Sequence, residues 1–222
     1  MMSDLRLVLF DVDGTLVDSQ GAIVGAMTAA FTALELPVPS REEILSIVGL
    51  SLPVAIAQLV PDLAPELQAG VVQGYKNAYK SAREAGGAAH SPLYPGAREV
   101  LDVLNAVPEY LLGVATGKSQ RGLDELIKAH ALTCFVTRQV ADHHPSKPHP
   151  SMVMTAMAET GVAPAQTVMI GDTSYDIDMG RAAGVTTIAV DWGFHAAERL
   201  GADHVITSFA QLPPLLNKIW KG

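Results

Sequence analysis

One stretch near the amino terminus constrains this chain more than any other. An apolar run, Leu5-Arg6-Leu7-Val8-Leu9-Phe10, leads directly into Asp11-Val12-Asp13-Gly14-Thr15-Leu16. A short apolar run bounded by charge and glycine is typical of a buried parallel strand. Open α/β sheets bind their ligands beyond the carboxyl ends of the strands. The pattern therefore predicts a strand over residues 5–10 and a functional site at Asp11.

The two acids of this stretch differ in their predicted use. Gly14 permits a sharp exit from the strand and brings backbone N–H groups towards a ligand. The turn can separate Asp11 from Asp13, so that one serves as a nucleophile and the other as an acid/base. A bare Asp-x-Asp is more often only a solvated acidic turn. The longer run through Leu16 favours the catalytic interpretation.

The second half of the chain alternates strands and helices, which predicts a doubly wound parallel sheet of the α/β class. The expected strands are 110–116, 135–136, 167–170, 186–190 and 204–206, and the expected helices are 97–106, 123–130, 151–160 and one that ends at Gly184.

A transition-metal site is not predicted from His143, His144 and His149, because their spacing is not that of a standard ligand set. These three histidines are expected to lie in a solvated loop.

Between Ser19 and Ala89 the pattern is helical, with no convincing strand. Ser40 and Glu43 form a predicted capping box, and Gly86 to Ala89 is a predicted flexible exit. Helices are expected over 22–31, 40 to about 49, 54–59 and 66–83. This insert directly follows the Asp11 strand, so we interpret it as a lid rather than as decoration. The expected domains are a core of residues 1–18 plus 90–222 and a helical cap of residues 19–89.

A second acidic loop follows another predicted strand, in Gly171-Asp172-Thr173-Ser174-Tyr175-Asp176. Asp172 and Asp176 can converge with Asp11 on one hard cation. Oxygen ligands at strand ends, with a phosphate completing the shell, suit Mg²⁺. Asp178 is expected to cap a helix or to face solvent.

Two weaker signals lie between these loops. Thr116-Gly117-Lys118-Ser119 resembles a P-loop, but only three residues separate Gly113 from Gly117 where that motif needs four. A small hydroxyl and an open N–H at a strand end, as in Thr116 and Gly117, can cradle phosphate oxygens, although Thr-Gly taken alone is more often only a turn. Lys147 stands in a Lys-Pro-His-Pro run before a helix, which fixes one ammonium at a loop-to-helix junction. A lone lysine is usually solvated, so Lys147 is at this point only a candidate for the cation of the site.

Composition limits the partners. The formal net charge of −8, without any basic run, argues against nucleic acid as a partner. The single Cys134 cannot form an internal disulfide and is expected to be a packed core thiol. No signal pattern and no membrane-spanning window occur, so no membrane partner is expected, and a reducing, cytoplasmic setting is the default expectation.

The stretch from Asp11 to Ser19, Asp-Val-Asp-Gly-Thr-Leu-Val-Asp-Ser, resembles the first motif of the haloacid dehalogenase-like hydrolases. It is most similar to the phosphoglycolate phosphatase-like branch of that family, and the helical insert is similar to the family's first class of cap. Thr116, Lys147 and Asp172 match the later motifs in order. The resemblance implies Mg²⁺ held by the Asp11 carboxylate, the Asp13 backbone carbonyl and Asp172, with Asp176 in the second shell or ligating through water.

The resemblance also implies a reaction. Asp11 attacks phosphorus and becomes an aspartyl phosphate, while Asp13 protonates the leaving alkoxide and then deprotonates the hydrolytic water. Lys147, Thr116 and the N–H groups near Gly14 and Gly117 hold the phosphate. The expected partner is a small phosphorylated metabolite, with phosphoglycolate as the family's default, and the chain is expected to be a monomer or weak homodimer. Candidate anion contacts in the cap are Arg41, Lys76, Lys80 and Arg83.

Three other activities are weighed. Related dehalogenases lack an acid at the position of Asp13, because a halide leaves without a proton. Related sugar phosphomutases carry a basic residue where this chain has Leu52. A catalytically silent phosphate-binding protein would have no need of Asp13. The residues therefore favour a phosphatase, with the phosphomutase as first alternative and the silent binding protein as second.

Overall fold

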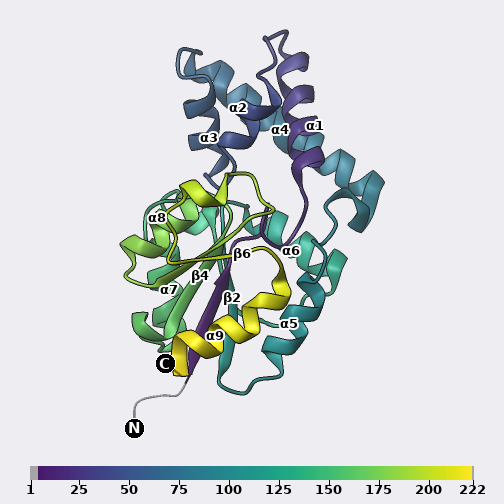
Figure 1. Cartoon of the computed structure of the whole chain (residues 1–222). Coiled ribbons are helices and arrows are strands. Elements are labelled where there is room, and N and C mark those ends of the chain that lie inside the picture. The colour runs from purple at the N-terminus through teal and green to yellow at the C-terminus, as the bar shows by residue number, and fades with distance from the viewer. Residues whose placement is uncertain (1–4, 222) are drawn as a thin grey trace.

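The computed structural model describes residues 5–221, and its centre is one sheet of six parallel strands in the order β3-β2-β1-β4-β5-β6 (Figure 1). Arg6–Phe10 of β1 pair with both β2 and β4, which places the predicted first strand in the middle of the sheet. The strands are β1 (Arg6–Phe10), β2 (Tyr110–Thr116), β3 (Phe135–Val140), β4 (Thr167–Gly171), β5 (Thr186–Val190) and β6 (His204–Ile206).

Helices cover both faces of the sheet, and this is why β1 is apolar at nearly every position. Leu7 and Leu9 belong to the core cluster that α7 and α8 complete, whereas Val8 and Phe10 belong to the cluster that α5, α6 and α9 complete. Burial of each of these side chains stabilises the fold by about 1.5–3 kcal/mol. These helices are α5 (Ala97–Asn105), α6 (Gln120–His130), α7 (Ser151–Thr160), α8 (Ser174–Ala182) and α9 (Leu212–Lys221).

The order of the strands creates a switch point beside β1. From β1 the chain crosses to β2 and β3 on one side, and then returns to β4, β5 and β6 on the other. A crevice forms at the carboxyl ends of the strands where the two halves diverge, which is where α/β folds bind ligands. Asp11 follows the carboxyl end of β1 at this point, as the sequence predicts.

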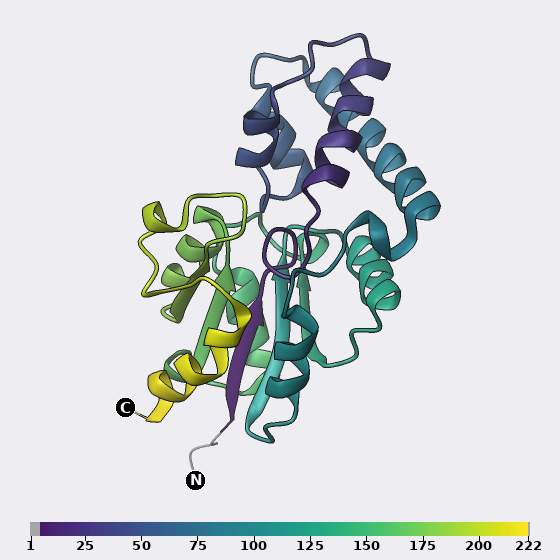
Figure 2. The same cartoon turned by 45° about the vertical axis from the view of Figure 1, so that its right-hand side comes forward.

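Four helices lie above the carboxyl end of the sheet (Figures 1 and 2). They have a hydrophobic cluster of their own, centred on buried residues such as Met27, Phe31 and Ile56. The predicted capping box is confirmed, because Ser40 Oγ accepts from the Glu43 N–H and the Glu43 carboxylate accepts from the Ser40 N–H. The helices are α1 (Gln20–Ala33), α2 (Arg41–Ser46), α3 (Leu52–Leu59) and α4 (Pro65–Gly86).

Residues 20–90, all within the described part of the chain, contain no strand, in agreement with the sequence prediction. The division into a core of residues 1–18 plus 90–222 and a cap of residues 19–89 stays a prediction, since nothing here measures the two units separately. Two boundaries differ from prediction. Helix α4 continues to Gly86, and the expected flexible exit is a 3₁₀ turn at Gly87–His90. Helix α2 ends at Ser46, before the expected Gly49.

The largest difference from prediction is β3, which runs from Phe135 to Val140 and not over two residues. Its polar members Thr137 and Gln139 are buried and hydrogen-bond to Glu159 of α7. A polar edge strand lacks the apolar signal on which the sequence prediction depended. Helix α6 also starts earlier, at Gln120, because Ser119 caps it by accepting from the Gly122 N–H.

The remaining short elements are 3₁₀ turns that connect these helices and strands. They span Gly87–His90, Ala141–His143, Pro164–Gln166, Ala197–Arg199 and Phe209–Gln211. Cys134 is a half-buried free thiol beside the main core cluster, less enclosed than expected, and burial raises its pKa. Among residues 5–221, no helix has both the length and the apolar character needed to cross a membrane.

Candidate active site

Three neighbouring strands bring the predicted site together. Asp11 follows β1, Thr116 ends β2 and Asp172 follows β4, and all three side chains are buried at the carboxyl edge of the sheet. Because parallel strands end at the same edge, residues more than 100 positions apart in sequence meet here. Asp11 and Asp172 come together with Asp176, as predicted, and Thr116 ends the neighbouring strand at the same edge.

Lys147 lies at the centre of the acidic cluster. Its ammonium is 2.8 Å from Asp11 Oδ1 and 2.6 Å from Asp176 Oδ1, and the side chain is fully enclosed. A buried ammonium needs such partners, because leaving it unpaired in a protein interior costs several kcal/mol. The structure thus places Lys147 where the sequence predicted the cation of the site.

The three carboxylates differ in how their oxygens are engaged. Asp172 accepts from the Thr15 hydroxyl at 2.8 Å and from the Phe194 N–H at 2.9 Å. Asp176 uses its second oxygen to accept from the backbone N–H and the hydroxyl of Thr173, as the closing residue of a helix cap. Asp11 Oδ2 is buried and has no hydrogen-bond partner. One oxygen of Asp11 is therefore held while the other is free to react or to bind.

Burial dominates the electrostatics of this cluster. It raises the pKa of Asp11 to about 7, a rise that the Lys147 ammonium partly offsets. It also raises the pKa of Asp172 well above its usual range, and the neighbouring carboxylates of Asp176 and Asp11 add to that rise. Burial lowers the pKa of Lys147, but the paired carboxylates of Asp11 and Asp176 outweigh it and raise the pKa overall. One ammonium does not neutralise three carboxylates, so the cluster has a deficit of positive charge.

These residues suit a hard divalent cation. Asp11, Asp172 and Asp176 each offer a carboxylate oxygen, and the three atoms lie within 4.8 Å of one another. An all-oxygen donor set with excess negative charge is what Mg²⁺ prefers. Asp172 and Asp176 both already use their two oxygens as hydrogen-bond acceptors, and the place of Asp176 behind the other ligands stays a prediction.

Close backbone approach shapes the loops predicted to bind phosphate. Gly14 has a φ of +85°, which favours glycine, and a Cβ there would lie 2.2 Å from Asp172 Oδ2. A Cβ on Gly117 would lie 2.6 Å from the Gly49 carbonyl oxygen and 2.7 Å from that of Leu50. Residues 49–50, between α2 and α3, therefore sit directly on the loop after β2. Thr116 is buried there, and its hydroxyl accepts from the Lys118 N–H at 3.2 Å.

Further contacts hold the helical region on the site. The Ser51 N–H donates to Ser146 Oγ at 2.9 Å, next to Lys147. The Ser46 carbonyl oxygen accepts from the Tyr175 hydroxyl at 3.2 Å and lies 3.3 Å from His195 Nε2. The helical region thus contacts the loops that follow β3 and β5 and the first turn of α8.

Replacement of Gly117 by Ala should reduce kcat/KM about 10- to 100-fold. The new Cβ would force residues 49–50 away from the loop after β2, and positional errors near 1 Å in a site cost this much activity. Steady-state kinetics would measure the loss. Gly25→Ala is the matched control, since a Cβ at Gly25 on α1 meets no atom within 4 Å. Equal kinetics of Gly117→Ala and the parent would contradict the close approach.

Lys118 also lies near the site, although no role was predicted for it from the sequence. Lys118 Nζ lies 2.8 Å from both carboxylate oxygens of Asp13, and both side chains are nearly buried. The sequence analysis considered Lys118 only within the rejected P-loop pattern. Its position two residues after Thr116, at the end of the same strand, was the signal that could have drawn attention to it.

Other candidates lie elsewhere. Arg41 bonds to Gln20, Lys80 forms an exposed pair with Glu84, and Lys76 is exposed, so these three do not reach the acidic cluster in the structure. Arg83 is the exception, because it lines a pocket beside Lys118 and is 3.9 Å from Glu125. Asp178 faces solvent and pairs with Arg181, as predicted.

One expectation for the histidines needs correction. His143 and His149 are exposed, as expected for a solvated loop. His144 is half-buried, with one ring nitrogen 2.8 Å from Ser151 Oγ and the other 2.8 Å from Gln139 Oε1. This network satisfies the polar residues of β3 that the sequence analysis did not recognise as a strand.

Comparison with known proteins identifies the family of this chain. Residues 8–190 match the family model of the haloacid dehalogenase-like hydrolases. The Probable phosphatase IndB of Dickeya dadantii is 35% identical over 199 residues, which cover 88% of this chain and 85% of that protein. The Phosphoglycolate phosphatase of Chromobacterium violaceum is 32% identical over 97% of this chain and 98% of its own length. The chain belongs to the haloacid dehalogenase-like hydrolase family.

Within that family the chain is a phosphatase of the phosphoglycolate phosphatase-like branch. Solved structures agree on the fold. A predicted phosphoglycolate phosphatase from Haemophilus somnus superposes with a TM-score of 0.83 at 22% identity, over 97% of this chain and 99% of that one. A haloacid dehalogenase-like hydrolase from Streptococcus pneumoniae gives 0.81 at 26% identity, over 96% and 99%.

Proposed function

We propose that this protein is a Mg²⁺-dependent phosphatase that hydrolyses a small phosphomonoester through an aspartyl phosphate on Asp11. The observation that carries the proposal is the state of the Asp11 carboxylate. One oxygen is fixed by Lys147 and the other is buried without a partner, at the switch point of the sheet. A nucleophile needs this combination of orientation and a free oxygen.

The residues of the chain divide the work as follows. Asp11 attacks phosphorus, and the phosphorus–oxygen bond to the leaving group breaks. Asp13 gives the leaving alkoxide a proton, and later takes one from the water that attacks the aspartyl phosphate. Lys147, the Thr116 hydroxyl and the N–H groups near Gly14 and Gly117 hold the phosphate oxygens and stabilise their charge.

Mg²⁺ would be held by the carboxylates of Asp11 and Asp172 and by the Asp13 backbone carbonyl. Asp176 would support these ligands or bind the ion through a water molecule. When bound, it supplies the positive charge that allows an anionic nucleophile to approach an anionic phosphate. The excess of carboxylates over cations around Lys147 supports this assignment.

A small substrate is supported by residues 49–50, whose carbonyl oxygens close the space directly above Gly117. Phosphoglycolate is the first candidate, because a relative that is 32% identical carries the name Phosphoglycolate phosphatase. Pyrophosphate is the second candidate substrate, because the Pyrophosphatase PpaX of Bacillus pumilus is 31% identical over 89% of this chain.

A phosphomutase is the weaker candidate. The position where related mutases carry a basic residue is Leu52, which begins α3 and packs against the hydrophobic cluster of the helical region. A leucine in that place supplies no cation for a second phosphate. We also propose a reducing, cytoplasmic setting for the enzyme and a monomer or weak homodimer as its state.

The proposal is tested with a panel of phosphoglycolate, other two- and three-carbon phosphates, pyrophosphate and a hexose phosphate, each with Mg²⁺. Released phosphate and the organic product are both measured. Hydrolysis of a small phosphomonoester in preference to pyrophosphate is expected. Conversion of the hexose phosphate to an isomer without release of phosphate would instead show a mutase.

Mg²⁺ should also stabilise the fold. A ligand at about 100 times its Kd adds about 2.7 kcal/mol to the free energy of unfolding. For a chain of this size, that corresponds to an increase in Tm of about 5–10 °C. Thermal unfolding with and without Mg²⁺ measures the shift. Asp172→Asn should reduce it and the exposed control Asp178→Asn should not; a Tm that is indifferent to Mg²⁺ would count against the metal site.

A further inference from the structure

The position of the Asp13 carboxylate depends on one side chain, that of Lys118. The Lys118 ammonium is 2.8 Å from Asp13 Oδ1 and 2.8 Å from Asp13 Oδ2, so it contacts the two carboxylate oxygens equally. The Lys118 and Asp13 side chains are only 10% and 13% exposed, so solvent screens the pair little. Contact with both oxygens fixes the direction in which the carboxylate faces as well as its distance, which a single hydrogen bond does not.

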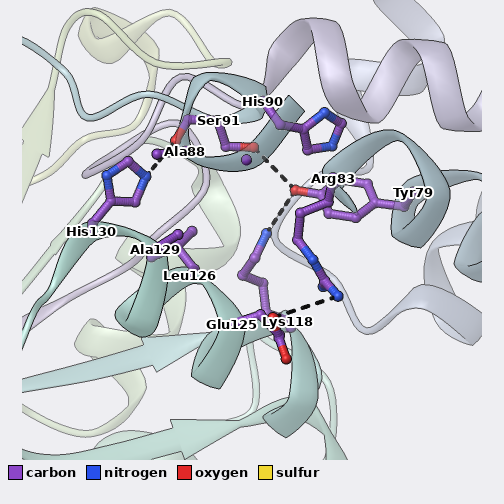
Figure 3. Close-up of a pocket in the computed structure, with 12 residues that line it drawn as sticks. Tyr79, Arg83, Ala88, His90, Ser91, Lys118, Glu125, Leu126, Ala129 and His130 are labelled. Atoms are coloured by element: carbon purple, nitrogen blue, oxygen red, sulfur yellow. Dashed lines mark hydrogen bonds and ion pairs between the residues drawn. The ribbon is translucent and has the colours of Figure 1, made fainter. Parts of the chain in front are cut away.

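Lys118 is in turn held by Tyr79 of α4 (Figure 3). Its ammonium donates to the Tyr79 hydroxyl at 3.3 Å and lies 5.2 Å from the centre of the Tyr79 ring. An ammonium has three N–H donors, and the two Asp13 oxygens and the Tyr79 oxygen account for all three. Lys118 therefore connects the predicted acid/base to the longest helix of the helical region.

Tyr79 has its own fixed surroundings. Its hydroxyl lies 3.3 Å from Ser91 Oγ, at the point where the chain returns from the helical region to the core. Its ring meets the His90 ring edge-on at 4.9 Å and stacks on Tyr75 at 5.7 Å. The hydroxyl can reach Lys118 only while α4 lies against this return segment. The position of α4 is thus transmitted through Tyr79 and Lys118 to Asp13.

We propose that Lys118 is a positioning residue that aligns Asp13 for proton transfer, and that Tyr79 places Lys118 only when α4 is docked on the core. This inference rests on the proposed function, in which Asp13 is the acid/base. Lys118 does not take part in the proton transfer itself. It makes the alignment of the acid/base conditional on the closed arrangement of the helical region.

The test compares proton-dependent and proton-independent steps. Lys118→Met keeps the length of the side chain but removes the grip on Asp13. With an alkyl phosphate, whose alkoxide leaves only with a proton, kcat should fall about 100-fold, as expected for a misplaced acid. With nitrophenyl phosphate the first turnover should change less than about threefold, and KM should stay within about threefold for both substrates.

Tyr79→Phe is the milder variant. It removes one hydrogen bond of about 0.5–1.5 kcal/mol, so kcat for the alkyl phosphate should fall about 2- to 10-fold. Lys118→Arg keeps the charge and should retain more activity than Lys118→Met. Lys128→Met, on the exposed face of α6, and Tyr110→Phe, at the opposite end of the sheet, are the matched controls and should behave as the parent.

A double-mutant cycle with Asp13→Asn distinguishes positioning from direct substrate contact. The rate of breakdown of the aspartyl phosphate formed from nitrophenyl phosphate is measured by chemical quench. If Lys118 acts through Asp13, adding Lys118→Met to Asp13→Asn should slow breakdown less than about twofold further. If Lys118→Met does not fold, the same cycle is run with Tyr79→Phe and Lys118→Arg.

If Lys118→Met slows breakdown of the aspartyl phosphate equally in the parent and in Asp13→Asn, the inference is overturned. A large rise in the KM of Lys118→Met would also overturn it, because that would show that Lys118 binds the substrate itself. These outcomes leave the proposed function intact, because the parent still forms the aspartyl phosphate. A parent enzyme that forms no aspartyl phosphate contradicts the proposed function and this inference together.

Discussion

Asp11→Asn should abolish turnover while the protein remains folded. The amide is nearly isosteric with the carboxylate, and the buried Lys147 keeps its 2.6 Å contact with Asp176, so the packing of the site survives. The amide is not a nucleophile, and removal of a true nucleophile reduces kcat by as much as about 10⁶. Phosphate release with the best substrate of the panel measures the loss, and Tm measures the fold.

The control for Asp11→Asn is Asp178→Asn, which makes the same chemical change at an exposed, ion-paired position. It should keep the kcat of the parent. Residual activity of Asp11→Asn above about a thousandth of the parent would show that another group attacks phosphorus. The loss of one buried negative charge beside Asp172 and Asp176 should not lower Tm in the absence of metal, because burial and neighbouring carboxylates already disfavour ionised Asp11.

Asp13→Ala should separate the two halves of the reaction. General acid–base catalysis typically contributes about 10²–10⁴. Nitrophenolate leaves without a proton, so attack by Asp11 on nitrophenyl phosphate should remain fast. Breakdown of the aspartyl phosphate needs a base for every substrate and should slow by about 10²–10⁴. A burst of nitrophenolate close to the enzyme concentration should therefore precede a nearly stalled steady state.

An alkyl phosphate is the internal control for Asp13→Ala, because its alkoxide needs the proton and the burst should then disappear. Asp13 is not one of the residues around Lys147, and its side chain contacts Lys118 instead, so the substitution leaves the acidic cluster untouched. If both substrates slow equally in the first turnover and no phosphoenzyme accumulates, Asp13 has a structural role. The acid/base would then be sought in the helical region.

Local sequence patterns were sufficient to predict much of the fold and of the candidate site. The strand before Asp11, the capping box at Ser40 and the helix from Ser151 to Gly161 were readable because each depends on neighbours within a few residues. The grouping of Asp11, Thr116 and Asp172 was also predictable, since parallel strands all end at one edge. β3 was underestimated because its polar residues are buried against Glu159, a partner that no local pattern reveals.

Only the tertiary structure decided which side chains meet across the site. Asp13 and Lys118 are 105 positions apart, and their contact depends on the register of β1 against β2 and on the turn at Gly14. The contact of Gly117 with residues 49–50 depends on how the helical region docks, which many weak contacts set together. The sequence by itself determined the chemistry at each strand end, because a strand places its last side chain by local geometry alone. The partner of each side chain and the depth of the site were decided by packing between distant segments.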